Sequence, residues 1–327
     1  MSKLVTIFGG SGFVGRYVAR RMAQDGWRVR VAVRRPNEAL HVKPYGRVGQ
    51  VEPVFCNIRD DDSVRAVTMG ADAVINCVGI MNEVGKNKFK SVQAEGAGRI
   101  ARIAAEQGVG QVVQISAIGA DAESNSIYAR TKGQGEAEVL AAYPNAVILR
   151  PSVIFGVEDQ FFNRFASLSF FGPILPLVGG KTRFQPVYVD DVAAAAVAAA
   201  EGKAAPGVYE LGGPDVATLD ALVKKMLKII HRRRLVVNKP FFAGTIIATV
   251  LDLVQTFTGG LVTNTILTKD QVKNLRIDNV VAPGAKGLAD LGVTPTPMDA
   301  VLPEYLYRFR PQGQYDDITN SAKNLKA

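Results

Sequence analysis

Apolar residues gather into seven short runs along the first two thirds of the chain. The runs cover residues 3–8, 27–33, 51–56, 72–78, 110–116, 146–150 and 207–211. Within them, apolar residues follow one another instead of alternating with polar ones. Continuous runs of this length are typical of strands that are buried on both faces, and the helix-length segments between them allow parallel crossovers. The pattern therefore predicts a parallel sheet covered by helices.

This alternation of strands and helices is typical of a doubly wound parallel α/β sheet of the Rossmann type. Segment 190–201 is expected to be a helix, because it is rich in alanine, the best helix former. Beyond Leu211 the alternation stops, and we expect a smaller, mostly helical C-terminal domain. The predicted parts are a nucleotide-binding domain at 1–155 plus 184–212, a smaller partner- or substrate-side domain at 156–183 plus 213–310, and a polar tail at 311–327.

The composition indicates a globular protein with a basic surface. Apolar residues make up 47% of the 327, and there are only 2 cysteines. Such values exclude collagen-like, disulfide-framed and disordered chains. The formal net charge is +9, and much of the excess lies between Lys224 and Pro240, where basic residues occur without any acidic one. A basic segment of this kind favours anionic partners.

A glycine-rich loop follows the first predicted strand. Glycines at positions 9, 12 and 15 permit a tight turn, let backbone N–H groups approach a pyrophosphate at a helix N-terminus, and bring helix and strand close together. A strand precedes the loop, and a helix and a second strand follow it, which is the context of a dinucleotide-binding loop. The residues expected to contact the nucleotide here are Gly9, Ser11, Gly12, Phe13, Val14 and Gly15.

Two arginines, Arg34 and Arg35, end the second predicted strand, where an NAD site usually carries Asp or Glu for the ribose hydroxyls. Guanidinium groups pair with a 2′-phosphate through charge-assisted hydrogen bonds, whereas an acid would repel it. The sequence therefore predicts NADP(H) as the cofactor. The alternative is that both arginines are surface charges on a loop.

Further motifs follow along the chain. They are Asn76-Cys77-Val78-Gly79, Tyr128-Ala129-Arg130-Thr131-Lys132, residues 150–159 beginning Arg150-Pro151, Val187–Val192, Leu291–Pro297 and Pro303-Glu304-Tyr305. With these motifs the chain resembles the atypical short-chain dehydrogenase/reductases, and within them the nucleotide-binding accessory subunit of respiratory complex I (NADH:ubiquinone oxidoreductase). The likeness covers most of the chain. It implies that Val78, Lys132 and Pro151 also belong to the cofactor site.

The Tyr-x-x-x-Lys motif places Tyr128 and Lys132 on one helix face. A nearby ammonium favours the phenolate, which would prepare Tyr128 as a general acid/base, and Lys132 could also hold the nicotinamide ribose. Ser116, twelve residues before Tyr128, completes a set similar to the Ser-Tyr-Lys set of the superfamily. The resemblance to the complex I subunit implies instead a nucleotide kept as a structural ligand. A free NADP-dependent reductase or epimerase of an apolar carbonyl substrate is the alternative.

Two apolar segments would face a substrate or a partner. Residues 161–171 hold five phenylalanines, which need a lipid-like substrate, a protein partner, a lid or ordinary core packing to cover them. Segment 241–267 has the spacing of an amphipathic helix and contains too many polar residues for a membrane span. Beside the basic run 224–239 it favours docking on an anionic membrane surface, although packing within the second domain is an equal alternative.

The expected partners are other complex I subunits and an anionic lipid surface. Nucleic acid is not expected, since no stacking platform or recognised motif accompanies the basic run. His41 and His231 have no metal-ligand partners at useful spacing, so we expect no metal site. The first residues lack the pattern of a secretory signal. We therefore expect a peripheral protein on the cytoplasmic face of the bacterial inner membrane, or on the matrix side if the protein is organellar.

Overall fold

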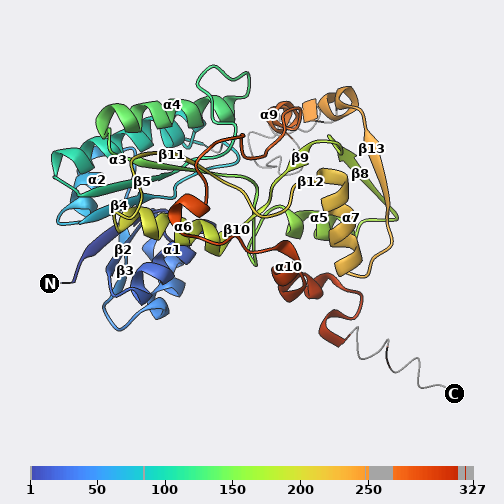
Figure 1. Cartoon of the computed structure of the whole chain (residues 1–327), viewed down its shortest axis with the longest axis horizontal. Coiled ribbons are helices and arrows are strands. Elements are labelled where there is room, and N and C mark those ends of the chain that lie inside the picture. The colour runs from blue at the N-terminus through green and yellow to red at the C-terminus, as the bar shows by residue number, and fades with distance from the viewer. Residues whose placement is uncertain (1, 84, 247, 250–267, 316–320, 322–327) are drawn as a thin grey trace. The chain divides into compact units, whose positions relative to one another are not determined.

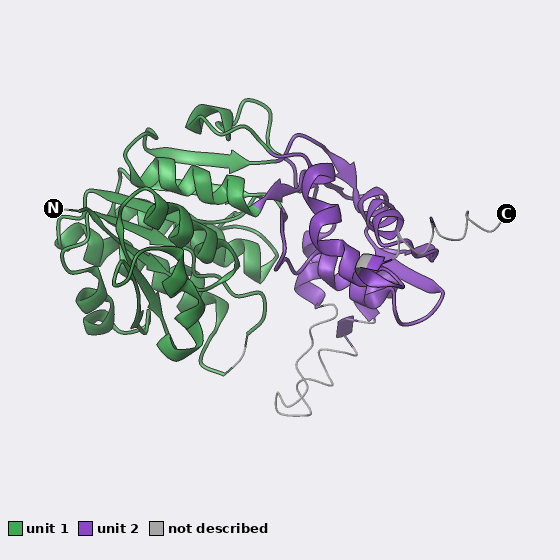
Figure 2. Ribbon diagram, turned by 90° about the horizontal axis from the view of Figure 1, so that it is seen from below, with its two compact units in different colours: residues 1–152, 189–212, 281–295 green, residues 153–188, 213–280, 296–327 purple. Residues whose placement is uncertain are grey.

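The structure is a computed structural model that describes residues 2–83, 85–246, 248–249, 268–315 and 321. The chain divides into two compact units, coloured separately in Figure 2. Unit 1 comprises Met1–Ser152, Val189–Gly212 and Val281–Pro295. Unit 2 comprises Val153–Tyr188, Gly213–Val280 and Thr296–Ala327.

A seven-stranded sheet forms the centre of unit 1 (Figure 1). All its strands run parallel, in the order β11–β6–β5–β4–β1–β2–β3. The strands are β1 (Leu4–Phe8), β2 (Arg28–Val33), β3 (Val51–Phe55), β4 (Ala73–Asn76), β5 (Gln111–Ile115), β6 (Val147–Pro151) and β11 (Gly207–Leu211). Each predicted apolar run corresponds to one of them, so the predicted doubly wound parallel sheet is confirmed.

Helices cover both faces of this sheet, which is why its central strands are mostly apolar, whereas Arg28 of β2 and Glu52 of the edge strand β3 are exposed. Helices α1 and α6 pack together on one face, and α2, α3 and α4 lie on the other (Figure 1). On that second face Phe8 and Val74 of the strands meet Val64 of α2 and Ile100 of α3 in one buried cluster. The α-helices are α1 (Phe13–Gln24), α2 (Asp61–Thr68), α3 (Glu95–Glu106), α4 (Ile127–Ala142) and α6 (Val189–Ala200), and shorter helical segments are Pro36–Tyr45, Lys90–Ala94 and Ala289–Leu291.

The strand order reverses direction at β1. The chain builds β2 and β3 on one side of β1 and then returns to build β4 on the other side. In open α/β sheets a ligand binds beside the carboxyl ends of the strands at such a switch point. The topology therefore predicts a ligand site at the residues that follow β1, β2, β3 and β4.

Residues 281–295 join unit 1, whereas the sequence analysis placed them in the smaller domain. The reason is their pairing with the edge strand β11. The Glu210 N–H donates to the Lys286 carbonyl at 2.8 Å, and the Glu210 carboxylate accepts from the Ala282 N–H at 2.8 Å. These bonds cover an otherwise open strand edge.

Unit 2 contains short strand pairs as well as the predicted helices. Strand β7 pairs with β10, β8 with β13, and β9 with β12. The strands are β7 (Ile154–Phe155), β8 (Ile174–Val178), β9 (Arg183–Phe184), β10 (Val187–Tyr188), β12 (Ala217–Thr218) and β13 (Leu235–Lys239). The helical segments are α5 (Phe162–Leu168), α7 (Leu219–Ile229), residues 241–246 and 248–249, α9 (Lys269–Asn274), α10 (Met298–Leu306), Tyr307–Phe309 and Gly313–Tyr315.

The phenylalanine-rich segment divides between core and surface. Phe162 is buried in the core of unit 2, and Phe161 and Phe165 pack against that core. Phe170 and Phe171, by contrast, are exposed. Of the predicted amphipathic helix over 241–267, residues 247 and 250–267 lie outside the described residues, as do 316–320 and 322–327 of the predicted tail.

Candidate nucleotide-binding site

A cavity of about 550 Å³ lies at the carboxyl ends of β1, β2, β3 and β4. Every lining segment follows one of these strands or belongs to the glycine loop, apart from two residues before α3. The lining residues are Gly9, Ser11, Gly12, Ala32, Val33, Arg34, Arg35, Glu38, Cys56, Asn57, Ile58, Arg59, Cys77, Val78, Gly79, Ile80, Asn87 and Val92. The cavity therefore occupies the position that the strand order predicts.

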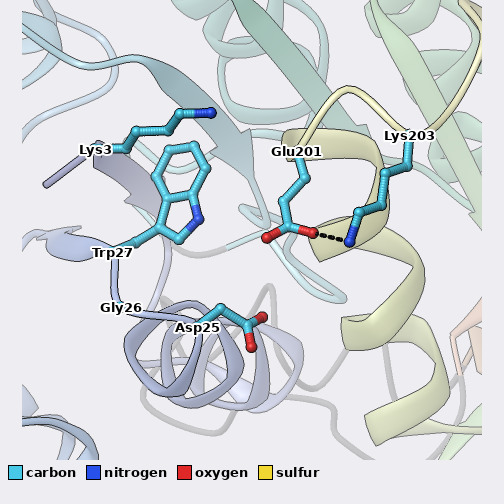
Figure 3. A pocket seen from close by; sticks show the side chains of 6 residues that line it. All are labelled: Lys3, Asp25, Gly26, Trp27, Glu201 and Lys203. Carbon is cyan, nitrogen blue, oxygen red and sulfur yellow. Dashed lines mark ion pairs between the residues drawn. The ribbon is translucent and has the colours of Figure 1, made fainter.

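A second hollow, of about 340 Å³, lies at the opposite, amino-terminal edge of the sheet (Figure 3). Four of its lining side chains contact one another in two pairs. The Lys203 ammonium pairs with Glu201 at 2.6 Å, and the Lys3 ammonium lies 5.3 Å from the centre of the Trp27 ring.

The glycine loop needs its glycines for two separate reasons. Gly9 has φ +72°, a conformation that residues with a side chain rarely adopt. A Cβ at Gly15 would lie 2.3 Å from the Gly9 carbonyl oxygen and 2.6 Å from the Gly10 Cα, so the loop and α1 touch there. Gly12 caps α1 without a side-chain hydrogen bond, which leaves the first N–H groups of the helix available to an anion.

Three arginines line the cavity, one more than the sequence analysis named. Arg35 pairs with Glu38 at 2.9 Å. Arg34 has no acidic partner among the described residues. Arg59, which follows β3, was missed. Its guanidinium donates to the Asn57 side chain at 3.3 Å and to the Lys86 carbonyl at 3.1 Å. Its position shortly after the predicted strand 51–56, at the same sheet edge as Arg34, is the signal that could have identified it.

Helix α4 carries Tyr128 and Lys132 on one face, as predicted. Ser126 caps the helix by accepting from the Ala129 N–H at 3.2 Å. The Tyr128 ring stands edge-on to Phe89, and burial raises the pKa of its hydroxyl to about 12. The Lys132 ammonium is buried and donates to the Ile115 carbonyl at 3.2 Å. Burial lowers the pKa of Lys132 to about 8. In both groups burial therefore favours the uncharged form, which is the phenol of Tyr128 and the amine of Lys132.

Ser116 is engaged in a buried polar network. Its hydroxyl donates to the carboxylate of Glu136, which lies one turn beyond Lys132 on α4. Two parallel bonds from Arg150 hold that carboxylate, Nε to Oε1 at 2.9 Å and Nη2 to Oε2 at 2.5 Å. A hydroxyl that already donates to a fixed carboxylate has no second proton with which to polarise a carbonyl. Sequence reasoning missed Glu136 as this partner.

The predicted site residues divide between the cavity and its surroundings. Those that line the cavity are Gly9, Ser11, Gly12, Arg34, Arg35 and Val78. Phe13, Val14 and Gly15 begin α1, and Pro151 ends β6. Ser116, Tyr128 and Lys132 are not among the described lining residues, although a Cβ at Gly79 in the lining would lie 3.6 Å from the Lys132 Nζ.

Lys132 gives the folded chain a specific dependence on pH. Its pKa is about 8 in the fold and has an ordinary value of 10.5 in the unfolded chain. Between these values the unfolded chain binds a proton at Lys132 that the folded chain lacks, so the contribution of Lys132 to stability rises with pH through this window. The buried thiols of Cys56 and Cys77, whose pKa values are raised by burial to about 11 and about 12, act in the opposite direction above pH 9. Below pH 8 Lys132 is protonated in the folded chain, and burying this charge then lowers the free energy of unfolding by an amount of the order of 3 kcal/mol. We therefore expect the free energy of unfolding of Lys132→Met minus that of the wild-type chain to fall by about 3 kcal/mol between pH 8 and 10.5, as measured by urea unfolding of both.

The matched control is Lys228→Gln, since Lys228 is an exposed lysine of α7. The difference between its free energy of unfolding and that of the wild-type chain should stay constant between pH 8 and 10.5. If Lys132→Met and the wild-type chain have parallel stability profiles over this range, the lysine is not buried as a costly charge.

Within the described ranges, no group of three or more His, Cys, Asp or Glu side chains could hold a metal ion. The helices described there also include none long and apolar enough to cross a membrane.

Comparisons with known proteins agree with this geometry. The model of the NAD dependent epimerase/dehydratase family matches residues 5–212. The mitochondrial NADH dehydrogenase (ubiquinone) 1 alpha subcomplex subunit 9 of Arabidopsis thaliana is 36% identical over 98% of this chain and 81% of its own length. A ceramide reductase of Caulobacter vibrioides is 35% identical over 60% of each chain.

The crystal structure of gox2253 has the same fold. It superposes with a TM-score of 0.71 at 21% identity, covering 96% of this chain and 99% of that one. The matched family residues contain the glycine loop, the cavity and helix α4. The chain therefore belongs to the NAD dependent epimerase/dehydratase family and is a homologue of the alpha subcomplex subunit 9 of respiratory complex I.

Proposed function

We propose that this chain is an NADP(H)-binding accessory subunit of respiratory complex I that holds its nucleotide as a structural ligand to stabilise or assemble the complex. The observation that carries the proposal is similarity to a complex I subunit over 98% of the chain, which reaches far beyond the family-wide nucleotide-binding part. A ligand that binds only the folded chain stabilises it by mass action.

The residues of the cavity fit a dinucleotide phosphate. The close contact at Gly15 and the positive φ of Gly9 hold the loop against α1, so that the helix N-terminus can receive a pyrophosphate. Arg34 and Arg59 offer guanidinium groups to a 2′-phosphate, while Arg35 is partly neutralised by Glu38. The bound nicotinamide would supply a hydride donor or acceptor. We assign the choice of NADP(H) over NAD(H) chiefly to Arg34.

The engaged serine favours a structural ligand over turnover. Ser116 donates to Glu136, and Arg150 fixes that carboxylate. The raised pKa of Tyr128 keeps its phenol protonated at neutral pH, which opposes its use as a base. Lys132 can hold a ribose hydroxyl without any reaction. Ser116, Tyr128 and Lys132 are thus all present, but their contacts favour binding of the nucleotide over its use in a reaction.

Arg34→Asp tests the nucleotide assignment. Because the substitution replaces a cation that lines the cavity with an anion, we expect NADPH affinity to fall about thirtyfold, while NADH affinity stays within a few-fold. Isothermal titration calorimetry measures both. Arg28→Asp, at the opposite end of the same strand, is the matched control and should leave both affinities unchanged. Equal affinities of the wild-type chain for NADPH and NADH would contradict the assignment.

Tyr128→Phe separates the structural role from catalysis. We expect Tyr128→Phe to leave the content and turnover of complex I intact, and Arg34→Asp to lower the content of assembled complex. Native gels and NADH:ubiquinone activity of membranes measure both quantities. The opposite pattern, with activity lost only in Tyr128→Phe, would favour an enzyme.

One comparison favours a second candidate function. The similarity to a ceramide reductase supports a free NADP-dependent reductase of an apolar carbonyl substrate, with Tyr128 as acid/base. That relative matches only 60% of this chain, and the engaged Ser116 argues against it. Purification from gently solubilised membranes distinguishes the two, since an accessory subunit copurifies with complex I and a free reductase does not.

The proposed role implies a location and partners. We propose that the chain binds other complex I subunits and lies peripherally at an anionic membrane surface. That surface would be the cytoplasmic face of a bacterial inner membrane, or the matrix side in an organelle. The basic run 224–239 supports the lipid contact, since each cation near an anionic surface contributes about 1 kcal/mol.

A further inference from the structure

Strands β8 and β13 of unit 2 form a two-stranded parallel ribbon with apolar residues on both faces. Residues paired in register point to the same side of such a ribbon. On the inner side, Leu175 and Leu177 are buried in the core of unit 2, and Val236 packs against it. On the outer side, Ile174 pairs with Leu235, and neither is covered.

The uncovered residues are large and lie close together. Phe171 is 82% exposed, Ile174 53% and Leu235 64%. The Leu235 N–H donates to the Pro173 carbonyl at 2.8 Å, which ties the start of β13 to the loop between Phe171 and Ile174. We call Phe171, Ile174 and Leu235 the ribbon surface. Exposed apolar residues grouped in this way mark a contact with another apolar body.

Cations without acidic partners border the ribbon surface. Arg232, Arg233 and Arg234 directly precede β13, and none of them has an acidic partner among the described residues. Arg234 donates to the Ser169 carbonyl at 2.8 Å, and the Arg232 guanidinium lies 4.0 Å from the centre of the Phe170 ring. These contacts hold the two guanidinium groups beside the apolar residues while leaving their positive charge uncompensated.

Two lysines of α7, unlike these arginines, have acidic partners among the described residues. Lys224 pairs with Asp220 at 2.6 Å, and Lys225 pairs with Asp299 at 2.8 Å. Part of the basic run is therefore neutralised within unit 2. Of the five other basic residues in the run, three are the arginines next to the ribbon surface, Lys239 ends β13, and Lys228 lies on α7.

The geometry points to the ribbon surface as the part of the chain that enters an anionic bilayer, with Phe171, Ile174 and Leu235 in the headgroup–acyl boundary and Arg233 and Arg234 at lipid phosphates. Apolar side chains bordered by guanidinium groups match the two layers of such an interface. The inference deepens the proposed membrane location by assigning the contact to this ribbon. It does not depend on the nucleotide.

Vesicle binding by the purified full-length chain tests the inference. We expect the chain to cosediment with phosphatidylcholine vesicles that contain phosphatidylglycerol, and more weakly with phosphatidylcholine alone. The double substitution Phe171→Ser with Leu235→Ser should lower binding at least about tenfold, because it removes apolar surface from the contact. Arg233→Gln should lower binding about fivefold, on anionic vesicles only.

Two control variants remove exposed apolar side chains or an exposed cation from unit 1 instead of unit 2. Val48→Ser with Met69→Ser removes two exposed apolar side chains, and Arg20→Gln removes an exposed cation of α1. Both should bind vesicles like the wild-type chain. NADPH binding reports that unit 1 of each variant is folded, and protected amide hydrogens of α5 and α10 report the same of unit 2.

Two results would overturn the inference. One is a ribbon double variant that binds anionic vesicles as well as the wild-type chain does. The other is a wild-type chain that ignores vesicles while the double variant lowers complex I content, which would assign the ribbon surface to a protein subunit. In either case normal NADPH binding would leave the proposed function standing.

Discussion

Substitution of Gly15 by alanine is expected to lower the affinity for NADPH about a hundredfold, and to destabilise unit 1 by about 2 kcal/mol. A Cβ at this position would lie 2.3 Å from the Gly9 carbonyl oxygen and 2.6 Å from the Gly10 Cα. Both atoms belong to backbone, so the loop and α1 must move apart. That movement displaces the N–H groups that would hold the pyrophosphate.

Calorimetric titration with NADPH and urea unfolding followed by tryptophan fluorescence measure the two effects. Trp27 is the single tryptophan of the chain and lies in unit 1, so its fluorescence follows that unit. Gly108→Asn is the control, because Gly108 has φ +68° and nothing lies within 4 Å of its missing Cβ. Wild-type affinity in Gly15→Ala would refute the role of the glycine loop.

Substitution of Asp159 by alanine is expected to destabilise unit 2 by about 3–5 kcal/mol. The carboxylate is fully buried and accepts from the Phe161 and Asn163 N–H groups at 3.0 Å, from the Gly156 N–H at 3.2 Å and from the Tyr305 hydroxyl. It thus joins the start of α5 to α10, which lies far away along the sequence. Alanine leaves all these buried donors without an acceptor.

Hydrogen exchange measures this effect locally. Amides of α5 and α10 should exchange much faster in Asp159→Ala, while those of the β1–β6 strands keep their protection. Tyr305→Phe removes one donor and its hydrogen bond to Asp159, and should lower the free energy of unfolding by about 1 kcal/mol. Gln160→Ala, at the exposed neighbouring position, is the control and should change nothing. Unchanged exchange in α5 and α10 of Asp159→Ala would show that the carboxylate does not hold them together.

Local patterns were sufficient to predict the sheet of unit 1. Each strand buried on both faces requires a continuous apolar run, and that requirement is visible within five or six residues. The glycine loop is equally local, because its turn, the start of α1 and the contact at Gly15 all lie within seven residues. Arg34 was identified in the same way, from its position after β2.

Contacts between distant segments could not be predicted from these patterns. Strand β13 was missed because its partner β8 lies about sixty residues earlier, and a short run of three apolar residues in a basic segment has no periodicity of its own. The bonds of Glu210 that place residues 281–295 in unit 1 are of the same kind.

The sequence by itself therefore determined the fold class, the glycine loop and the arginine after β2, since each depends on residues close together in the chain. Only the tertiary structure decided that Arg59 lines the same cavity, that the Ser116 hydroxyl is held by Glu136, and that Leu235 faces outward beside Ile174. Which hydroxyl remains available, and which apolar face remains uncovered, depends on segments that folding brings together from far apart.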